Sequence, residues 1–273
     1  LVAAVMQAAA GDTRIVGLVD YGSDGGRSLD EWSDIDVAVF VHDGYFGAFM
    51  AERPHWPAQF GDVVYRRGGE TSGHPFNRAV YGTATIPLRV DAVFYRESEA
   101  GRAFRWPEIP TAVAVVVWFD RTGGRLTSHM RALAEQSLRP ADPAAAFRLA
   151  SDDLWYYLLD ACCKLERGDQ WGTRLLYHMT VVPPLIRLLR LEADQIDRWY
   201  GAPAAKGIDD ALSSERRDQL HASIPDSDLQ SMRAVLQRVT ALASVVSATL
   251  ASRYGVTWPD VLAGLIASLL VNA

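Results

Sequence analysis

A pair of aspartates separated by one residue follows a glycine–serine step near the start of the chain. Gly22 and Ser23 come directly after an apolar run, and Asp34 and Asp36 open a second apolar run. Residues i and i+2 of a strand project from the same face, so we expect the two carboxylates to lie side by side, with Ile35 turned toward the core. Carboxylates held this close raise each other's pKa unless a cation lies between them.

These residue types suit a magnesium ion and a phosphate group. Mg²⁺ prefers oxygen ligands, usually takes one or two carboxylates, and completes its coordination with substrate phosphates. Gly22 allows the backbone to approach a ligand closely. Ser23 supplies a hydroxyl and, if a helix begins there, lies at an amide-rich N-terminus that favours phosphate. The motif therefore predicts a site for Mg²⁺ and a nucleotide; the alternative is a surface strand edge with solvated aspartates.

A third acid lies inside another strand-like run. Asp91 stands in the apolar segment Leu88–Tyr95, where a carboxylate is costly unless it is paired or bound to a metal. We interpret Asp91 as a third site residue; the alternative is a structural partner for Arg89 or for another arginine at the edge of the core.

The Gly-Ser step, the spacing of about ten residues and the Asp-x-Asp pair resemble the signature of nucleotidyltransferases built on the DNA polymerase β catalytic fold. The resemblance implies that Asp34 and Asp36 hold one or two Mg²⁺ ions. It also implies that Gly22 and Ser23 contact the phosphates of ATP or another nucleoside triphosphate. Asp91 would be either the general base for the attacking hydroxyl or a further metal ligand, and pyrophosphate would leave.

Residues 1–140 mix strand and helix patterns and form the expected catalytic domain. The stretch 53–87 lacks clear periodicity and is rich in glycine, proline and polar residues, so we interpret it as a substrate-facing loop or a decorated sheet edge. We expect helices at Leu1–Ala10, Gly44–Glu52 and Leu126–Leu138. Strands are expected at Arg14–Asp20, Ile35–Val41, Gly61–Arg66, Leu88–Tyr95 and Ala112–Phe119.

Residues 141–273 show helical patterns throughout and form the expected second domain, a helical bundle that binds substrate by the resemblance. Asp142 is a good helix N-cap with Pro143 at the first position, and Pro183 and Pro184 should kink or break a later helix. The predicted fold class is therefore α+β: a mixed sheet with flanking helices, followed by an all-α bundle. Helices are expected at Pro143–Arg167, Gln170–Glu192, Ile208–Ser223, Asp226–Tyr254 and Trp258–Leu270.

Residues 152–179 of the helical half place two acids, an aromatic cluster and an Arg-Gly helix end before a second apolar helix, and they resemble the C-terminal domain of antibiotic nucleotidyltransferases. Over most of its length, the chain is similar to the two-domain lincosamide nucleotidyltransferases among them. The similarity rests on Tyr-Gly-Ser, Trp-Ser-Asp-Ile-Asp, the third acid before Ala-Val-Phe-Tyr, and Leu154-Trp155 followed by Leu165-Glu166-Arg167-Gly168. It implies transfer of AMP to a lincosamide hydroxyl. Two alternatives stay open: an aminoglycoside adenylyltransferase, and a nucleotidyltransferase that modifies a protein or only binds nucleotide as a regulator. The stretch 53–87 departs from the family and looks longer.

The net charge of −6 disfavours a general nucleic-acid binder and suits a small cationic substrate. Lys164 is a candidate phosphate contact from the second domain; the alternative is a solvated helix residue. An acidic and aromatic set on the same helix is a candidate surface for the antibiotic, although its Trp has the spacing of a core residue. The set comprises Asp152, Asp153, Trp155, Tyr156 and Asp160.

Adjacent Cys162 and Cys163 favour free thiols in a reducing cytoplasm. The first residues have no basic region of the kind that opens a signal peptide, and the apolar segment Val261–Val271 is too short to span a bilayer. We therefore expect a cytoplasmic enzyme without a membrane partner. The family resemblance adds a homodimer as an expected assembly.

Overall fold

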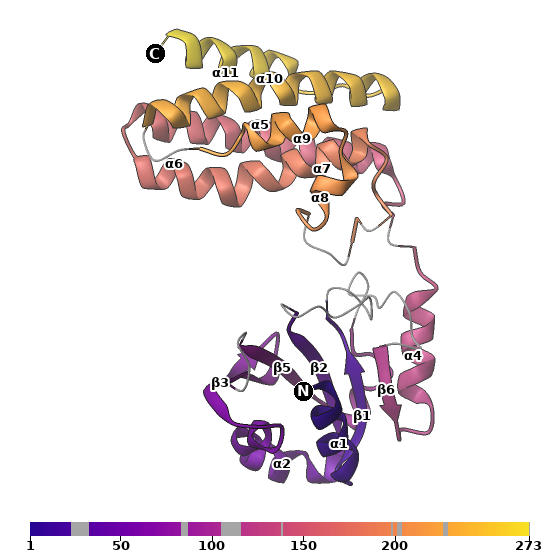
Figure 1. Cartoon of the computed structure of the whole chain (residues 1–273). Helices are drawn as coiled ribbons and strands as arrows, with labels where there is room; N and C mark the ends of the chain where they lie inside the picture. The colour runs from indigo at the N-terminus through magenta and orange to yellow at the C-terminus, as the bar shows by residue number, and fades with distance from the viewer. Residues whose placement is uncertain are drawn as a thin grey trace. The chain divides into compact units, whose positions relative to one another are not determined.

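The computed structural model describes residues 1–22, 33–82, 87–104, 116–137, 139–197, 199–200, 204–225 and 229–272. It divides the chain into two compact units, Leu1–Ser137 and Leu138–Ala273 (Figure 1). The first unit combines a six-stranded sheet with helices, and the described part of the second contains helices without strands. The predicted α+β fold class is confirmed.

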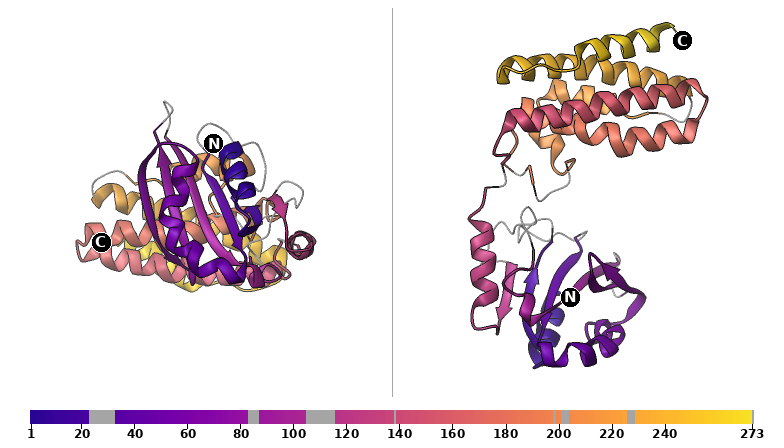
Figure 2. Two further views of the ribbon diagram at one scale, coloured as in Figure 1. Left: turned by 90° about the horizontal axis from the view of Figure 1, so that it is seen from below. Right: turned by 180° about the vertical axis from the view of Figure 1, so that it is seen from behind.

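The sheet of the first unit is mixed and has the order β3-β4-β5-β2-β1-β6. β2 and β5 run parallel, and all other neighbouring pairs are antiparallel. Figure 2 shows this sheet from two further directions. The strands are β1 Ile15–Asp20, β2 Ile35–Val41, β3 Val63–Thr71, β4 His74–Tyr81, β5 Leu88–Arg96 and β6 Val117–Asp120.

Apolar side chains cover both faces at the centre of the sheet. Val37 and Val39 of β2 belong to one cluster, which includes residues of α1 (Val2–Gly11) and α2 (Phe46–Glu52). Phe40 of β2 belongs to the opposite cluster, which includes residues of α4 (Arg125–Ala134). A strand buried on both faces reads as a continuous apolar run, which is why β1 and β2 are recognisable in the sequence.

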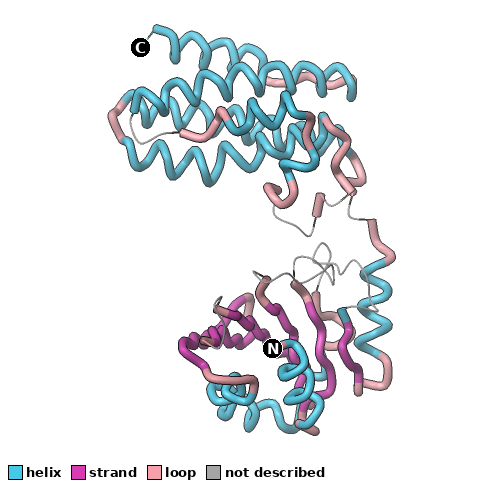
Figure 3. The backbone as a smooth tube through the Cα atoms, viewed as in Figure 1, coloured by secondary structure: helices cyan, strands magenta, loops and turns pink. Residues whose placement is uncertain are grey.

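The described part of the stretch 53–87 is largely an ordered edge of the sheet, which agrees with the second of its two interpretations, a decorated sheet edge, and not with the loop. A 3₁₀ helix at Arg53–Gln59 leads into the hairpin of β3 and β4 (Figure 3). The predicted strand Gly61–Arg66 is present but runs farther, and β4 was not predicted. The turn is tight, with Ser72 and Gly73 both at positive φ. Most side chains of β3 are exposed, so burial imposes no periodicity on its sequence.

Other boundaries differ by a few residues. The predicted strand Ala112–Phe119 corresponds to β6, which begins at Val117, and residues 112–115 lie outside the described residues. The helix predicted at Leu126–Leu138 ends earlier, because α4 stops at Ala134. Short 3₁₀ helices at Asp43–Tyr45 and Glu97–Glu99 follow β2 and β5.

The second unit follows the predicted helical pattern. Asp142 caps the first helix, because its Oδ1 accepts a hydrogen bond of 2.9 Å from the Ala145 N–H. The predicted interruption near Pro183 and Pro184 is a π-helical turn at Tyr177–Val181, after which a new α-helix begins with the prolines in its first turn. The helices are α5 Pro143–Glu166, α6 Gln170–Leu176, α7 Val182–Glu192, α8 Ile208–Ala211, α9 Ser214–His221, α10 Leu229–Tyr254 and α11 Asp260–Asn272.

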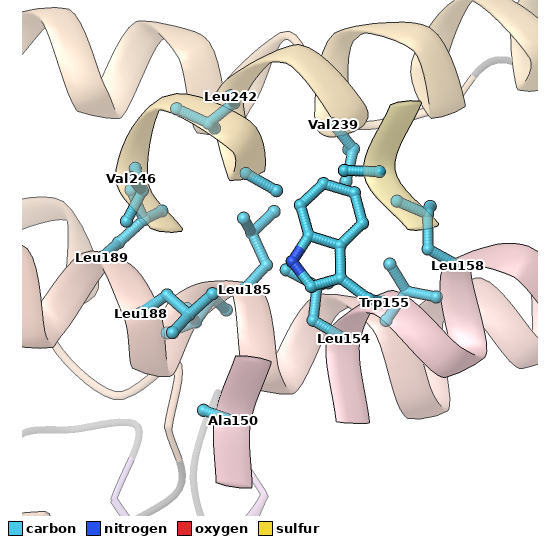
Figure 4. Close-up of a cluster of buried hydrophobic side chains, with 14 of the residues drawn as sticks. Ala150, Leu154, Trp155, Leu158, Leu185, Leu188, Leu189, Val239, Leu242 and Val246 are labelled. Atoms are coloured by element: carbon cyan, nitrogen blue, oxygen red, sulfur yellow. The ribbon is translucent and has the colours of Figure 1, made fainter. Parts of the chain in front are cut away.

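The core of the helical unit is built around a tryptophan (Figure 4). Trp155 of α5 is fully buried with Leu154 and Leu158, against Leu185 of α7 and Val239 of α10. This burial confirms the core spacing of Trp155 and removes it from the candidate substrate surface. In α10, the segment Gln230–Tyr254 is long and apolar enough to cross a membrane, but more than half of its most apolar window is buried inside the unit, as in a core helix.

Candidate functional site

Asp36 and Asp91 stand side by side on neighbouring strands. β2 and β5 pair in parallel with Asp36 directly opposite Asp91. Paired residues project from the same face of a sheet, so both carboxylates leave the same face. Asp34 lies immediately before β2, and its negative charge contributes to raising the pKa of Asp36. The three predicted acids therefore lie close together, near the start of β2 and beside β5.

The turn after β1 approaches this site through its backbone. The Tyr21 N–H donates to the Asp36 carbonyl oxygen at 3.0 Å, and the Gly22 N–H donates to Asp20 Oδ1 at 3.0 Å. A Cβ added at Gly22 would lie 3.1 Å from Asp20 Oδ1 and 3.5 Å from Asp36 Oδ2. The absence of a side chain at Gly22 therefore leaves space beside these carboxylate oxygens. Ser23, the predicted phosphate contact, lies outside the described residues.

The acids carry negative charge that the protein compensates only in part. Burial, together with the charges of Asp34, Asp91 and Asp20, raises the pKa of Asp36 to about 6. Burial also raises the pKa of Asp20, and it raises that of Asp91 against the opposing charge of Arg78. A cation between the carboxylates would reverse these shifts, because it favours their ionised forms.

Two arginines already contact the acids. Arg78 Nε lies 2.8 Å from Asp91 Oδ2, and Arg89 Nη2 lies 3.6 Å from Asp34 Oδ2. Within the described ranges, no three acidic, histidine or cysteine side chains are gathered as a metal cluster. Mg²⁺ needs only one or two carboxylates when phosphates complete its coordination, so Asp34 and Asp36 fit the ion as donors.

Three neighbours of the site were missed in the sequence. Asp20 is only 8% exposed, and its signal was a carboxylate at the end of an otherwise apolar strand. Tyr21 lies close enough to Asp36 and Asp91 for their charges, after burial, to raise its pKa. Arg78 left no usable signal, because β4 itself was not recognised.

The other predicted residues lie in the helical unit. Lys164 Nζ is 3.9 Å from Asp169 Oδ2 near the end of α5. Asp152 and Asp153 are exposed, and the Tyr156 side chain is 66% exposed. Cys162 is buried and Cys163 half-buried, and both are free thiols as predicted.

Comparisons with known proteins return matches among solved structures alone. No protein-family model matches the chain, and no curated protein matches its sequence. The fold is similar to that of an aminoglycoside 6-adenyltransferase from Bacillus subtilis, with 15% identity, 99% of this chain and 97% of that chain covered, and a TM-score of 0.46. It is also similar to a nucleotidyltransferase-like protein from Exiguobacterium sibiricum, with 13% identity, 86% and 71% covered, and a TM-score of 0.35. At these values the likeness adds no weight to an assignment of activity or substrate.

Proposed function

We propose that the chain is a nucleotidyltransferase that moves a nucleoside monophosphate, AMP in the first instance, from a magnesium-bound nucleoside triphosphate to a hydroxyl of a small molecule. The observation that carries the proposal is the register of β2 and β5, which sets Asp36 beside Asp91 on one face. Asp34 and the open backbone at Gly22 complete the arrangement. Carboxylates beside a glycine turn are the parts that a metal-dependent phosphoryl transfer requires.

The side chains have separate roles in this proposal. Asp34 and Asp36 hold Mg²⁺, which when bound neutralises charge on the phosphate oxygens. Gly22 leaves space for the phosphates beside Asp36, and Ser23 contacts them. Asp91 accepts the proton of the attacking hydroxyl, or ligates a second ion.

Arg78 acts through Asp91 in this scheme. Its Nε donates to Asp91 Oδ2 at 2.8 Å and fixes the direction in which that carboxylate points. The guanidinium also opposes the effect of burial on the pKa of Asp91. Arg78 therefore favours the ionised form of Asp91, which is the form that a general base requires.

The antibiotic acceptors enter from the sequence resemblance. A lincosamide is the first candidate. An aminoglycoside, whose positive charges are opposite in sign to the net negative charge of the chain, is the second. A protein acceptor in a regulatory nucleotidyltransferase is the third. Catalysis by residues 1–140, substrate binding by residues 141–273, a phosphate contact from Lys164, a homodimer and a cytoplasmic location are further parts of the proposal.

Pyrophosphate release from Mg-ATP tests the proposal with clindamycin, lincomycin, kanamycin and streptomycin as acceptors. Release with the first two drugs supports a lincosamide, and release with the last two supports an aminoglycoside. If none of the four drugs causes pyrophosphate release while Mg²⁺-dependent ATP binding persists, the proposal of nucleotidyl transfer stands with a different acceptor. Absence of Mg²⁺-dependent nucleotide binding contradicts the proposed function.

A further inference from the structure

A row of polar side chains crosses the sheet from its edge to its centre. Cross-strand pairing sets Arg67 of β3 opposite Arg78 of β4, and Arg78 opposite Asp91 of β5. Asp91 in turn pairs with Asp36 of β2, to whose carbonyl the Tyr21 N–H donates. Paired residues share a face, so the two arginines continue the line of the two acids toward the β3 edge.

Arg78, the arginine next to Asp91 in this row, contacts side chains on two sides. Arg78 donates to Asp91 at 2.8 Å, and its guanidinium carbon lies 5.3 Å from the centre of the Phe76 ring. Gly69 provides the space for that ring, because a Cβ there would come within 2.8 Å of Phe76 Cε1. The Arg78 side chain is still 55% exposed, so its remaining N–H groups are open to a ligand.

Arg67 is the outermost residue of this row. Arg67 is exposed, and no ion pair or hydrogen bond of its side chain is present among the described residues. Its neighbour Arg66 projects to the opposite face, where it donates to the Pro54 carbonyl. Like charges directly opposite each other on a sheet are destabilising. An anion bound between Arg67 and Arg78 would relieve that repulsion.

The face of β3, β4 and β5 that carries Arg67 and Arg78 has more positive than negative side chains. On β3, β4 and β5, within the described residues, Asp91 is the one acid that shares the face with Arg67, Arg78 and Arg89. Arg89 lies near Asp34, which the proposed function assigns to Mg²⁺. Arg67 and Arg78 therefore share this face of the three strands with a single carboxylate. A polycation would be repelled from this surface.

In-line displacement assigns the arginines to the acceptor. The nucleophile and the leaving pyrophosphate lie on opposite sides of the phosphorus. The phosphates of the proposed function lie at Gly22, on the β1 side of Asp36. The attacking hydroxyl must then approach from the β5 side, where Asp91 lies, and the rest of the acceptor extends over β4 and β3.

We infer that the acceptor is a hydroxyl compound that carries an anionic group, a carboxylate or a phosphate, bound by Arg67 and Arg78. Guanidinium groups bind both anions through paired hydrogen bonds. Tyr65, two residues before Arg67 and 58% exposed, offers a ring beside the same position. The inference rests on the nucleotidyl transfer of the proposed function. It replaces the cationic antibiotic acceptors, which carry no carboxylate or phosphate, with an anionic hydroxyl compound.

Three sugars that differ in charge test the inference: glucose, glucosamine and glucose 6-phosphate. Each is titrated calorimetrically into the full chain, alone and loaded with Mg²⁺ and α,β-methylene-ATP. We expect glucose 6-phosphate to bind at least about 10-fold more tightly than glucose, and glucosamine more weakly than glucose. Arg67→Gln should remove most of this preference and leave nucleotide affinity unchanged. Arg66→Gln, the matched control on the opposite face, should keep the preference.

The outcomes separate this inference from the proposed function. Equal binding of the three sugars, or tighter binding of glucosamine, overturns the inference. So does an Arg67→Gln variant that loses affinity for the nucleotide and not for the sugar phosphate, because the arginines would then serve the triphosphate. If the nucleotide fails to bind while glucose 6-phosphate still binds through Arg67, the anion site stands and the nucleotidyl-transfer proposal fails.

Discussion

Charged side chains at the centre of the sheet and at its edge differ in their exposure to solvent. At the centre, Asp20 is buried and Asp36 is half-buried, and burial raises the pKa of both. At the edge, Arg67 and Arg78 are exposed. A buried charge without a partner costs stability, whereas an exposed one costs little. Changes at the centre should therefore alter folding and chemistry together, and changes at the edge should alter binding or turnover while leaving folding nearly unchanged.

Asp36→Asn provides the largest effect and the strongest test of this contrast. Loss of a metal-binding carboxylate should reduce turnover by at least about 1,000-fold, because the charge on the phosphates is no longer neutralised. The same variant should be more stable than the wild type at pH 7 without metal, by about 1–2 kcal/mol after allowance for partial exposure. Pyrophosphate release and urea unfolding measure the two effects.

The pH dependence gives the sign of the stability effect. The pKa of Asp36 is about 6 in the folded protein, above its ordinary value of 3.8. The protonated form is therefore favoured by folding, and its contribution is complete below pH 3.8 and is lost as the pH rises through 6. The stability advantage of Asp36→Asn should be small at pH 4 and appear between pH 4 and 6. If Asp36→Asn is less stable than the wild type at pH 7, the ionised Asp36 carboxylate does not destabilise the folded protein and this explanation is contradicted.

Asp91→Asn distinguishes the two roles left open for this carboxylate. As a general base, its loss should reduce turnover by about 100- to 10,000-fold and leave the affinity for Mg-ATP unchanged. As a metal ligand, its loss should weaken Mg²⁺-dependent ATP binding as well. Turnover and equilibrium nucleotide binding, measured on the same preparation, decide between them.

Gly22→Ala should have an intermediate effect. The added methyl group would stand 3.1 Å from Asp20 Oδ1 and 3.5 Å from Asp36 Oδ2, in the space assigned to phosphate. We expect affinity for Mg-ATP to fall by about 10-fold, the equivalent of about 1.4 kcal/mol. Gly47→Ala is the matched control, because a Cβ there meets nothing within 4 Å and the site is a helix. That control should bind nucleotide normally and unfold at equal or higher temperature.

The same contrast explains what the sequence revealed. β2 was predicted with its observed bounds, because burial on both faces forces an apolar run, in which Asp36 stands out as a polar residue. Asp34 was found two residues before Asp36, and Asp91 as the acid inside the separate apolar run of β5. β4 carries Pro75 and Asn77 on a partly exposed hairpin, so neither propensity nor alternation identified it, and Arg78 was missed with it. Asp20 was overlooked although it is a carboxylate at the end of an apolar strand, because its hydrogen bond to the Gly22 N–H depends on the geometry of the turn.

Arg78→Gln should give the smallest effect on turnover and sharpen the division between edge and centre. The charge of Arg78 lowers the pKa of Asp91, so its removal should raise that pKa further. If Asp91 is the general base, the acidic limb of the pH–kcat profile moves to higher pH, with a larger loss of turnover at pH 6 than at pH 8. Arg78→Lys keeps the charge and should restore much of the limb.

An exposed residue that acts in this way should leave folding nearly unchanged. We expect Arg78→Gln to shift the free energy of unfolding by no more than about 1 kcal/mol, since exposed ion pairs contribute little. Urea unfolding beside the pH–kcat profile checks both parts. An unmoved acidic limb would assign Arg78 to the acceptor alone, whereas a large loss of stability would show that the hairpin edge supports the fold as strongly as the buried centre does.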